Sequence, residues 1–183
     1  MNITPTPLAG VHVVEHAYAQ DARGGFARLF CDTELAPLLG QRRIRQINGS
    51  ITREAGTVRG LHYQHPPHAE MKFVRCLRGR VWDVAVDLRA GSPTFLRWHA
   101  ETLSAHDGRM LVLPEGVAHG FQALEADTEL LYLHTACYAP QAEAGVHCQD
   151  GRLAITWPLP VRGLSPRDQG HPPLGADFHG VSL

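Results

Sequence analysis

Histidine and lysine side chains recur among glycines at spacings that could build one chemical site. Gly56 precedes His62 by six positions, and Lys72 precedes Gly79 by seven. A second group follows the pattern G-x5-P-x-G-x2-H and consists of Gly108, Pro114, Gly116 and His119. A neutral imidazole accepts protons near pH 7, whereas a lysine ammonium offers three donors and no acceptor. These residue types favour acid–base chemistry over metal binding, because an ammonium opposes a divalent cation.

The spacings resemble the signature of the cupins, a family of small antiparallel β-barrels. In that signature, G-x5-H-x-H is followed by a glutamate ligand that lies seven positions before a glycine. Here Tyr63 and Gln64 follow His62, and Lys72 occupies the position of the acidic ligand. The resemblance implies a barrel pocket. The lysine in the acidic ligand position predicts that this pocket works without metal or cofactor, with His62 and Lys72 as organic catalysts.

Composition sets outer bounds on fold and location. A chain of 183 residues suits one domain, 1–183. A net charge of −1 gives no electrostatic case for a nucleic acid or membrane partner. We see no apolar run of membrane-spanning length and no signal-peptide pattern at the N-terminus, and we expect a cytoplasmic protein.

Cys31, Cys76, Cys137 and Cys148 lack paired spacing. We therefore expect reduced, mostly buried thiols rather than zinc ligands.

Short strand signals separated by turns dominate the chain, which has 18 glycines and 13 prolines. Such a series predicts an all-β antiparallel barrel or jelly roll. Expected strands cover residues 11–14, 44–51, 72–77, 81–88, 96–99, 110–113, 121–124 and 129–135. We expect one short helix around residues 33–39 and an irregular C-terminal tail after Trp157.

Alternation in two of these strands predicts which side chains face the barrel interior. In the first, one face carries Trp82, Val84, Val86 and Leu88, and the other carries Val81, Asp83, Ala85 and Asp87. In the second, one face carries Leu131, Leu133 and Thr135, and the other carries Leu130, Tyr132 and His134. The pairing of tyrosine with histidine on one face is consistent with a polar lumen.

Longer segments resemble the dTDP-4-dehydrorhamnose 3,5-epimerases of deoxysugar biosynthesis. The most specific are R-G-L-H-Y-Q at residues 59–64 and P-E-G-V-A-H-G-F at residues 114–121. Further matches lie at residues 72–76, 79–89 and 91–95, at Tyr132, and at Tyr138-Ala139-Pro140. The resemblance extends from about residue 10 to residue 168. It implies a nucleotide-linked 4-keto-6-deoxy sugar as substrate and a homodimer as the assembly.

Inverting a carbon beside a ketone needs a base on one face, an acid on the other and a cation near the enolate oxygen. The resemblance implies that His62 is the base, Lys72 stabilises the enolate and Tyr132 is the acid. It assigns Asp168 as the carboxylate partner of His62, and we prefer it to Asp83, which lies on a strand near the same motif.

The resemblance also implies residues that hold the nucleotide-sugar. Tyr138 would stack on thymine, and arginine guanidinium groups suit a diphosphate. The other implied binding residues are Arg23, Gln46, Asn48, Arg59, His119, Glu143 and Arg167. Arg23 would reach the partner's site through exchanged N-terminal strands.

Departures from the family pattern leave alternatives open. Arg28 replaces an acidic substrate contact, and the family's W-D-D-P segment reads Cys148-Gln149-Asp150-Gly151. One alternative is a relative that inverts only C3 or only C5. A second is a metal-dependent cupin dioxygenase using His62, His65, Glu70 and His119, which the spacing and Lys72 disfavour. A third is a non-catalytic sugar-binding barrel.

Overall fold

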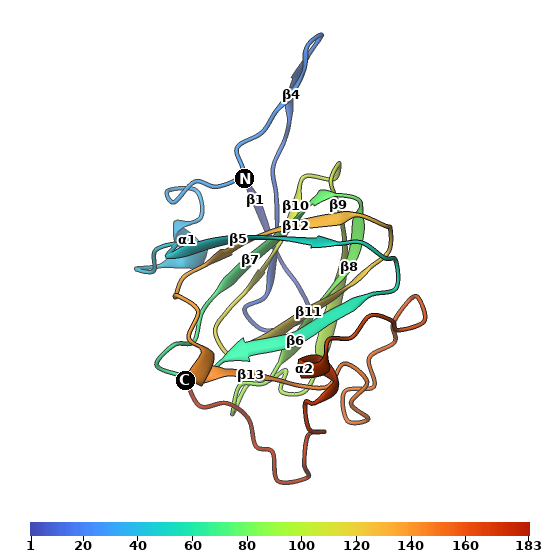
Figure 1. Ribbon diagram of the computed structural model, residues 1–183. Coiled ribbons are helices and arrows are strands. Elements are labelled where there is room, and N and C mark those ends of the chain that lie inside the picture. The colour runs from blue at the N-terminus through green and yellow to red at the C-terminus, as the bar shows by residue number, and fades with distance from the viewer.

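Two antiparallel sheets face each other across the interior of the protein (Figure 1). The computed structural model describes residues 1–183. The six-stranded sheet has the order β1 (Asn2–Pro5), β2 (His12–Glu15), β10 (Arg109–Leu113), β7 (Lys72–Arg78), β12 (Thr128–His134) and β5 (Gln46–Thr52). The five-stranded sheet has the order β13 (Glu143–Gly145), β6 (Val58–Gln64), β11 (Val117–Ala123), β8 (Arg80–Asp87) and β9 (Trp98–Ser104). The all-β, cupin-like prediction is confirmed.

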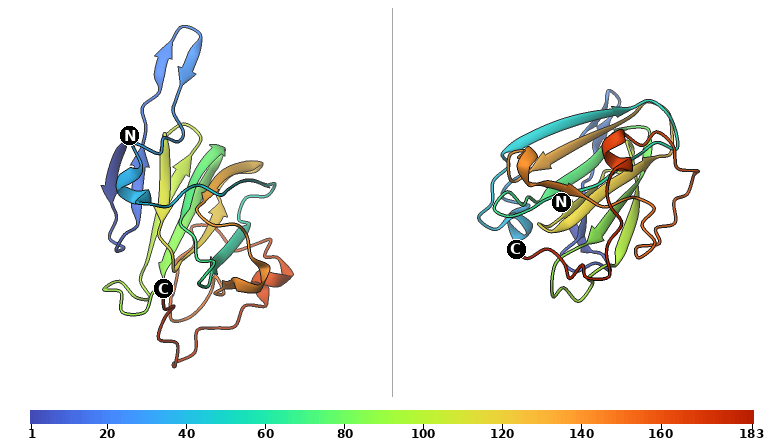
Figure 2. Two further views of the ribbon diagram at one scale, coloured as in Figure 1. Left: turned by 90° about the vertical axis from the view of Figure 1, so that its left-hand side faces the viewer. Right: turned by 60° about the horizontal axis from the view of Figure 1, so that its bottom comes forward.

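Helical structure is limited to three short pieces: α1 (Ala36–Leu39), a 3₁₀ turn (Pro140–Ala142) and α2 (Pro166–Gln169). None of them is long and apolar enough to cross a membrane. The strands β3 (Ala19–Asp21) and β4 (Gly24–Phe26) form a separate hairpin that projects away from the two sheets (Figures 1 and 2).

The two faces that alternation separates on β8 pack into different cores. Val81 and Ala85 of β8 pack with Leu130 of β12 in the core between the sheets. The alternate residues Val84 and Val86 belong to a second core, which the C-terminal tail covers with side chains such as Ile155 and Val181. A third core lies outside β7, where Phe73 and Leu133 pack beneath Leu39 of α1.

Strand existence was predicted better than strand limits. Every expected strand is present, but β9 begins at Trp98, after Leu96 adopts a positive φ of 60°. The prediction missed β1, β3, β4, β6 and β13. In β6 the reason is its burial on both faces, since its residues are mostly buried without a polar–apolar alternation. The tail was expected to be irregular throughout, which is wrong at α2.

Two glycines let β6 approach β11 closely. Gly60 has φ +118°, and a Cβ on it would lie 2.5 Å from Gly120 Cα. A Cβ on Gly120 would in turn lie 2.8 Å from the Arg59 carbonyl oxygen. With no side chain in the way, the strands pair so that His62 lies directly opposite His119.

The four cysteines are free thiols, as expected. Cys76 and Cys148 are buried, Cys31 is half-buried and Cys137 is exposed, so the expectation of burial holds for only half of them.

Candidate active site

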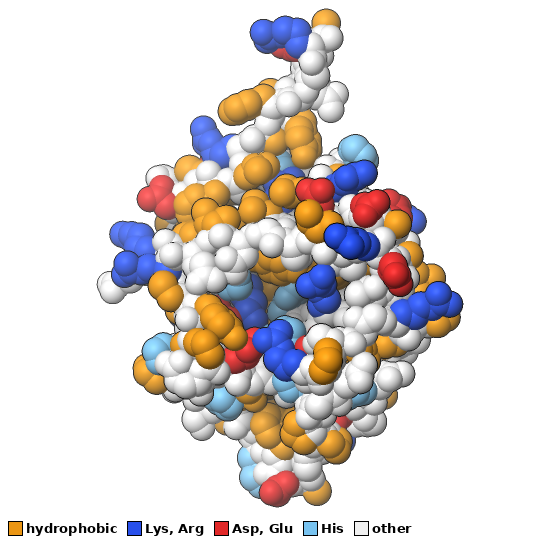
Figure 3. Space-filling view, viewed as in Figure 1, with side chains coloured by type: hydrophobic (Ala, Val, Ile, Leu, Met, Phe, Trp, Pro, Cys, Tyr) orange, Lys and Arg blue, Asp and Glu red, His pale blue; other side chains and the backbone are white.

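A cavity of about 840 Å³ opens between the two sheets. Its walls come from β5 and β12 on one side and from β6 and β11 on the other, and α2 closes one edge. Figure 3 shows this face hollowed at its centre, with basic and histidine side chains gathered in and around the hollow.

All of the predicted site residues except Arg23 line this cavity. They are His62, Lys72, Tyr132, Asp168, Gln46, Asn48, Arg59, His119, Tyr138, Glu143 and Arg167. Arg23 lies instead in the turn of the β3–β4 hairpin, where its exposed guanidinium pairs with Asp21 at 2.6 Å. Within one chain, therefore, Arg23 does not line the cavity, and its place in the partner's site stays a prediction.

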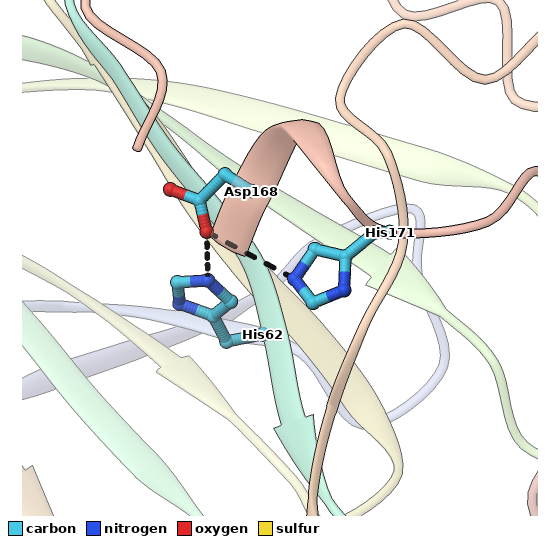
Figure 4. A group of neighbouring side chains, drawn as sticks. All are labelled: His62, Asp168 and His171. Carbon is cyan, nitrogen blue, oxygen red and sulfur yellow. Dashed lines mark hydrogen bonds and ion pairs between the residues drawn. The ribbon is translucent and has the colours of Figure 1, made fainter. Parts of the chain in front are cut away.

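His62 and Asp168 form a short hydrogen bond, 2.6 Å between Nε2 and Oδ1 (Figure 4). His62 comes from the middle of β6, and Asp168 comes from α2. Ser165 caps α2 by accepting a hydrogen bond from the Asp168 amide, and Pro166 suits the first helical position. Burial acts to raise the pKa of the Asp168 carboxyl, but the hydrogen bond from His62 and the nearby positive charges outweigh it and lower the pKa. Asp168 is therefore a carboxylate at neutral pH.

A second imidazole–carboxylate pair lies across from the first. His119 Nε2 and Asp83 Oδ1 are 2.8 Å apart, and Asp83 is completely buried. Contacts therefore distinguish the two candidate partners of His62. Asp168 is hydrogen-bonded to His62, whereas Asp83 is hydrogen-bonded to His119. The edge-on packing of His119 against the Tyr132 ring, with centroids 5.9 Å apart, fixes its orientation further.

Lys72 reaches the cavity from β7 and is almost completely buried. Its Nζ donates to the His62 carbonyl oxygen at 2.8 Å and lies 3.2 Å from Glu70. Burial lowers the pKa of Lys72, while the Glu70 carboxylate acts in the opposite direction. These two partners leave one of the three N–H groups available for a ligand in the cavity.

Tyr132 lines the same cavity as His62 but comes from the opposite sheet. Its hydroxyl is 3.2 Å from Ser50 Oγ, and its ring stacks on His134 with centroids 6.1 Å apart. Burial raises the pKa of the phenol far above its usual value. The group therefore keeps its proton at neutral pH and can donate it to a bound molecule.

The mouth of the cavity combines an exposed aromatic ring with guanidinium groups. Tyr138 is half-exposed, and its hydroxyl donates to Glu143 at 2.8 Å. Arg167 donates to the same carboxylate, also at 2.8 Å. The Gln46 side-chain oxygen accepts from the Tyr138 amide. An aromatic face beside arginines suits a nucleotide base and its phosphates.

Several lining residues were not assigned to the site from the sequence. They include Ser50, Thr57, Glu70, Phe121 and His134. His134 could have been found, because strand alternation places it on the same face as Tyr132. Glu70 had been considered only as a metal ligand, but here it pairs with Lys72.

The four-residue metal set is not assembled. His65 packs its ring on Tyr63 and is not among the cavity residues. Both His62 and His119 already direct a ring nitrogen at a carboxylate. Arg28, the charge reversal noted in the sequence, pairs with Glu34 outside the cavity.

We expect stability to fall between neutral and mildly acidic pH because of His134. Burial, then the positive charges of Lys72 and His119, lowers its pKa from 6.5 to about 4. Between these values the unfolded chain binds a proton that folded His134 does not. Its stabilising effect is therefore present above pH 6.5 and is lost as the pH falls toward 4. For this half-buried ring we expect a loss of about 2 kcal/mol.

Urea unfolding at about pH 7.5 and about pH 5 measures this difference for the protein and for His134→Gln. The variant should lose less stability on acidification. His179→Gln changes an exposed histidine and controls for the loss of an imidazole. Equal acid sensitivity in all three proteins would contradict the assignment.

Comparison with known proteins gives a consistent family. The family model described as dTDP-4-dehydrorhamnose 3,5-epimerase matches residues 5–176. A dTDP-4-dehydrorhamnose 3,5-epimerase of Sinorhizobium fredii is 39% identical over 168 residues, which cover 91% of this chain and 86% of the relative.

Two solved structures are similar over most of their length. One is a Legionella pneumophila epimerase in complex with dTDP-4-keto-L-rhamnose, with a TM-score of 0.87, 40% identity and coverage of 93% of this chain and 90% of that one. The other is a 3'-monoepimerase of Streptomyces bikiniensis in complex with dTDP-quinovose, with a TM-score of 0.86, 32% identity and coverage of 93% and 86%.

Proposed function

Because the chain belongs to the dTDP-4-dehydrorhamnose 3,5-epimerase family, we propose that it inverts C3, C5 or both of a dTDP-4-keto-6-deoxyhexose through an enolate. One observation carries the proposal. The His62–Asp168 pair lies on one side of the cavity, and the Tyr132 phenol lies on the other side. A binding site alone needs no such opposed base and acid.

His62 is the proposed base. Asp168 accepts a hydrogen bond from the Nε2–H group, which leaves the lone pair of Nδ1 to take a proton from carbon. The imidazolium that forms is then stabilised by the same carboxylate. An Asp168 that is ionised at neutral pH suits this role.

Lys72 is the proposed electrophile. As the C–H bond breaks, negative charge collects on the C4 oxygen, and a buried ammonium stabilises that charge more strongly than water does. Glu70 favours the charged form of Lys72 against its burial. This arrangement supports activation of the ketone by the side chain, with no metal or cofactor required.

Tyr132 is the proposed acid. It approaches from the sheet opposite His62, and its protonated phenol can deliver hydrogen to the face of the enolate that His62 does not reach. His119, fixed by Asp83, is placed to hold the sugar from inside the cavity. Tyr138, Arg59 and Arg167 at the mouth suit the thymidine diphosphate.

Incubation with dTDP-4-keto-6-deoxyglucose in D₂O tests the function directly. Deuterium at both C3 and C5 supports double epimerisation, and deuterium at one carbon identifies a single-site enzyme. The single-site alternative has a specific support, since a Streptomyces niveus dTDP-4-dehydrorhamnose 3-epimerase is 39% identical over 92% of this chain. Absence of deuterium at both carbons would refute the proposal.

Replacing His62 by alanine should reduce deuterium incorporation about 10²–10⁴-fold, because a general base contributes about that much. Mass spectrometry of the recovered sugar nucleotide measures the rate. His65→Ala is the matched control, since it removes a histidine that lies outside the cavity. Near-normal exchange in the His62 variant would remove this residue from the role of base.

Replacing Tyr132 by phenylalanine should separate deprotonation from inversion. The variant keeps the stacked ring but loses the proton donor, so His62 and Lys72 can still form the enolate and His62 can return the proton to the original face. Deuterium should then still be incorporated from solvent while formation of the inverted sugar is lost, and NMR measures both rates. Equal loss of both would contradict the assignment of Tyr132 as the acid.

A homodimer is the proposed assembly, with Arg23 completing the partner's cavity. Arg23 lies on a projecting hairpin that does not reach its own cavity (Figure 2). The hairpin residue Phe26 is 77% exposed, and the edge strand β5 exposes Ile47 and Ile51. Unpaired edges and exposed apolar side chains favour association. The four free thiols support the cytoplasm as the compartment.

Mixing variants tests the shared site. Arg23→Ala and His62→Ala should each be weakly active alone. Co-expression should restore about a quarter of normal activity, because half of the dimers then hold one intact cavity out of two. A fully active monomer in light scattering, or no gain on mixing, would refute the proposal.

A further inference from the structure

His171 lies directly against the His62–Asp168 pair, yet it does not line the cavity (Figure 4). We propose that His171 is a positioning residue, which holds the His62 ring and the Asp168 carboxylate in register from outside the cavity. The proposal rests on the function proposed above, since the pair that it positions is the proposed base and its partner.

The contacts of His171 reach both members of the pair. Its Nε2 is 3.9 Å from Asp168 Oδ1, the same oxygen that accepts from His62. Its ring packs edge-on to the His62 ring, with centroids 5.8 Å apart and planes at 69°. A side chain only 14% exposed cannot swing away from these neighbours without opening the tail.

Gly145 provides the space that His171 occupies. Gly145 of β13 is the cross-strand partner of His62 on β6, so its side chain would normally be the neighbour of the imidazole. A Cβ on Gly145 would lie 2.5 Å from His171 Cε1 and closer still to Nε2. His171 thus takes the place of a cross-strand neighbour, although it comes from the chain beyond α2.

The electrostatic surroundings favour a neutral donor at this position. Four titratable or charged groups face His171: His62, Asp168, Arg167 and Glu143. Burial, then the charge of His62, lowers the pKa of His171, while Asp168 acts in the opposite direction. When His62 gains a proton, His171 therefore remains neutral, and its N–H can point at Asp168.

The buried Nε2 of His171 has no hydrogen-bond partner within the protein. Buried polar atoms are rarely left unpaired, and a small closure of the 3.9 Å gap would give this one a partner. The same closure would share Asp168 between two donors. Such sharing limits the positions that the carboxylate can adopt.

The ligand atoms of His62, Asp168 and His171 lie within 4.8 Å of one another, so a metal ion is the competing interpretation. The short His62–Asp168 bond already joins two of the three ligand atoms, and the third is buried. We therefore assign the cluster to positioning. Loss of wild-type activity on chelation, restored by zinc, would overturn this assignment.

Three substitutions separate packing from hydrogen bonding. His171→Phe keeps a ring against Gly145 but removes the donor, and His171→Gln places an amide nitrogen near the position of Nε2. We expect H171F to lower kcat about 10–100-fold with little change in KM, the usual range for partners of this kind. H171Q should recover most of the activity. His179→Phe, at an exposed position, is the matched control and should change neither quantity.

A pair of Gly145 variants, one in the wild-type chain and one in a His171→Ala background, tests packing independently of the donor. Gly145→Ala should impair the enzyme because its methyl group displaces the His171 ring. In a His171→Ala background the same change should cost little, because the space is then empty. Additive losses in the double variant would overturn the steric half of the proposal.

The NMR resonance of the His62 Nε2–H proton reports the hydrogen bond to Asp168, and it separates this inference from the proposed function because it needs no substrate. A resonance that shifts or broadens in H171F and returns toward the wild-type position in H171Q supports positioning even if no epimerase activity is found. An unchanged His62 resonance and identical kcat in H171F and H179F would refute it. If H171F does not fold, H171Q and the Gly145 pair give the same decision.

Discussion

The hydrogen bond between His62 and Asp168 joins groups 106 residues apart in the chain, and much of the structure is organised around it. His62 lies on β6, next to the edge strand of the five-stranded sheet, and Asp168 lies in the tail. For the bond to form, the tail must cross the outside of that sheet and return to its edge. It does so by covering Val84, Val86 and Leu88 with its own apolar side chains. The burial of those side chains is thus the driving force that delivers the carboxylate to the cavity.

The interior tolerates many ionisable groups because nearly every one has a partner. Asp83 pairs with His119, and Lys72 pairs with Glu70. Away from the cavity, buried Asp87 pairs with Arg89 and accepts from Ser92 and Thr94. An unpaired charge in such surroundings would cost several kcal/mol. Lys72 itself lines the cavity, so its remaining N–H group is available to a ligand there.

The sequence predicted what depends on local pattern. Alternation predicted that Tyr132 and His134 share one face of their strand, and both line the cavity. It could not predict β6 as a strand, since that strand is buried on both sides and carries no alternation. The family resemblance identified Asp168 as a site residue, whereas the local sequence pattern only assigns it to an irregular tail.

The position of Arg23 marks a different limit. The family resemblance predicts that Arg23 serves the partner's site, which only an assembly of two chains can form. The structure places this arginine on a hairpin outside its own cavity. His171 is the converse case, because no motif marks it and only the folded tail brings it within 3.9 Å of Asp168.

Replacement of an acidic metal ligand by Lys72 changes the electrostatic problem at the centre of the barrel. A divalent ion keeps its charge at any pH, whereas burial favours loss of the lysine proton. Glu70, which lies 3.2 Å away, opposes that loss, and Gln64 in turn donates to Glu70. Glu70 therefore has the same effect on the ammonium as a set of ligands has on a metal ion. It stabilises a positive charge in the buried interior of the barrel. The ammonium can remain buried at the cavity wall because this carboxylate is buried with it.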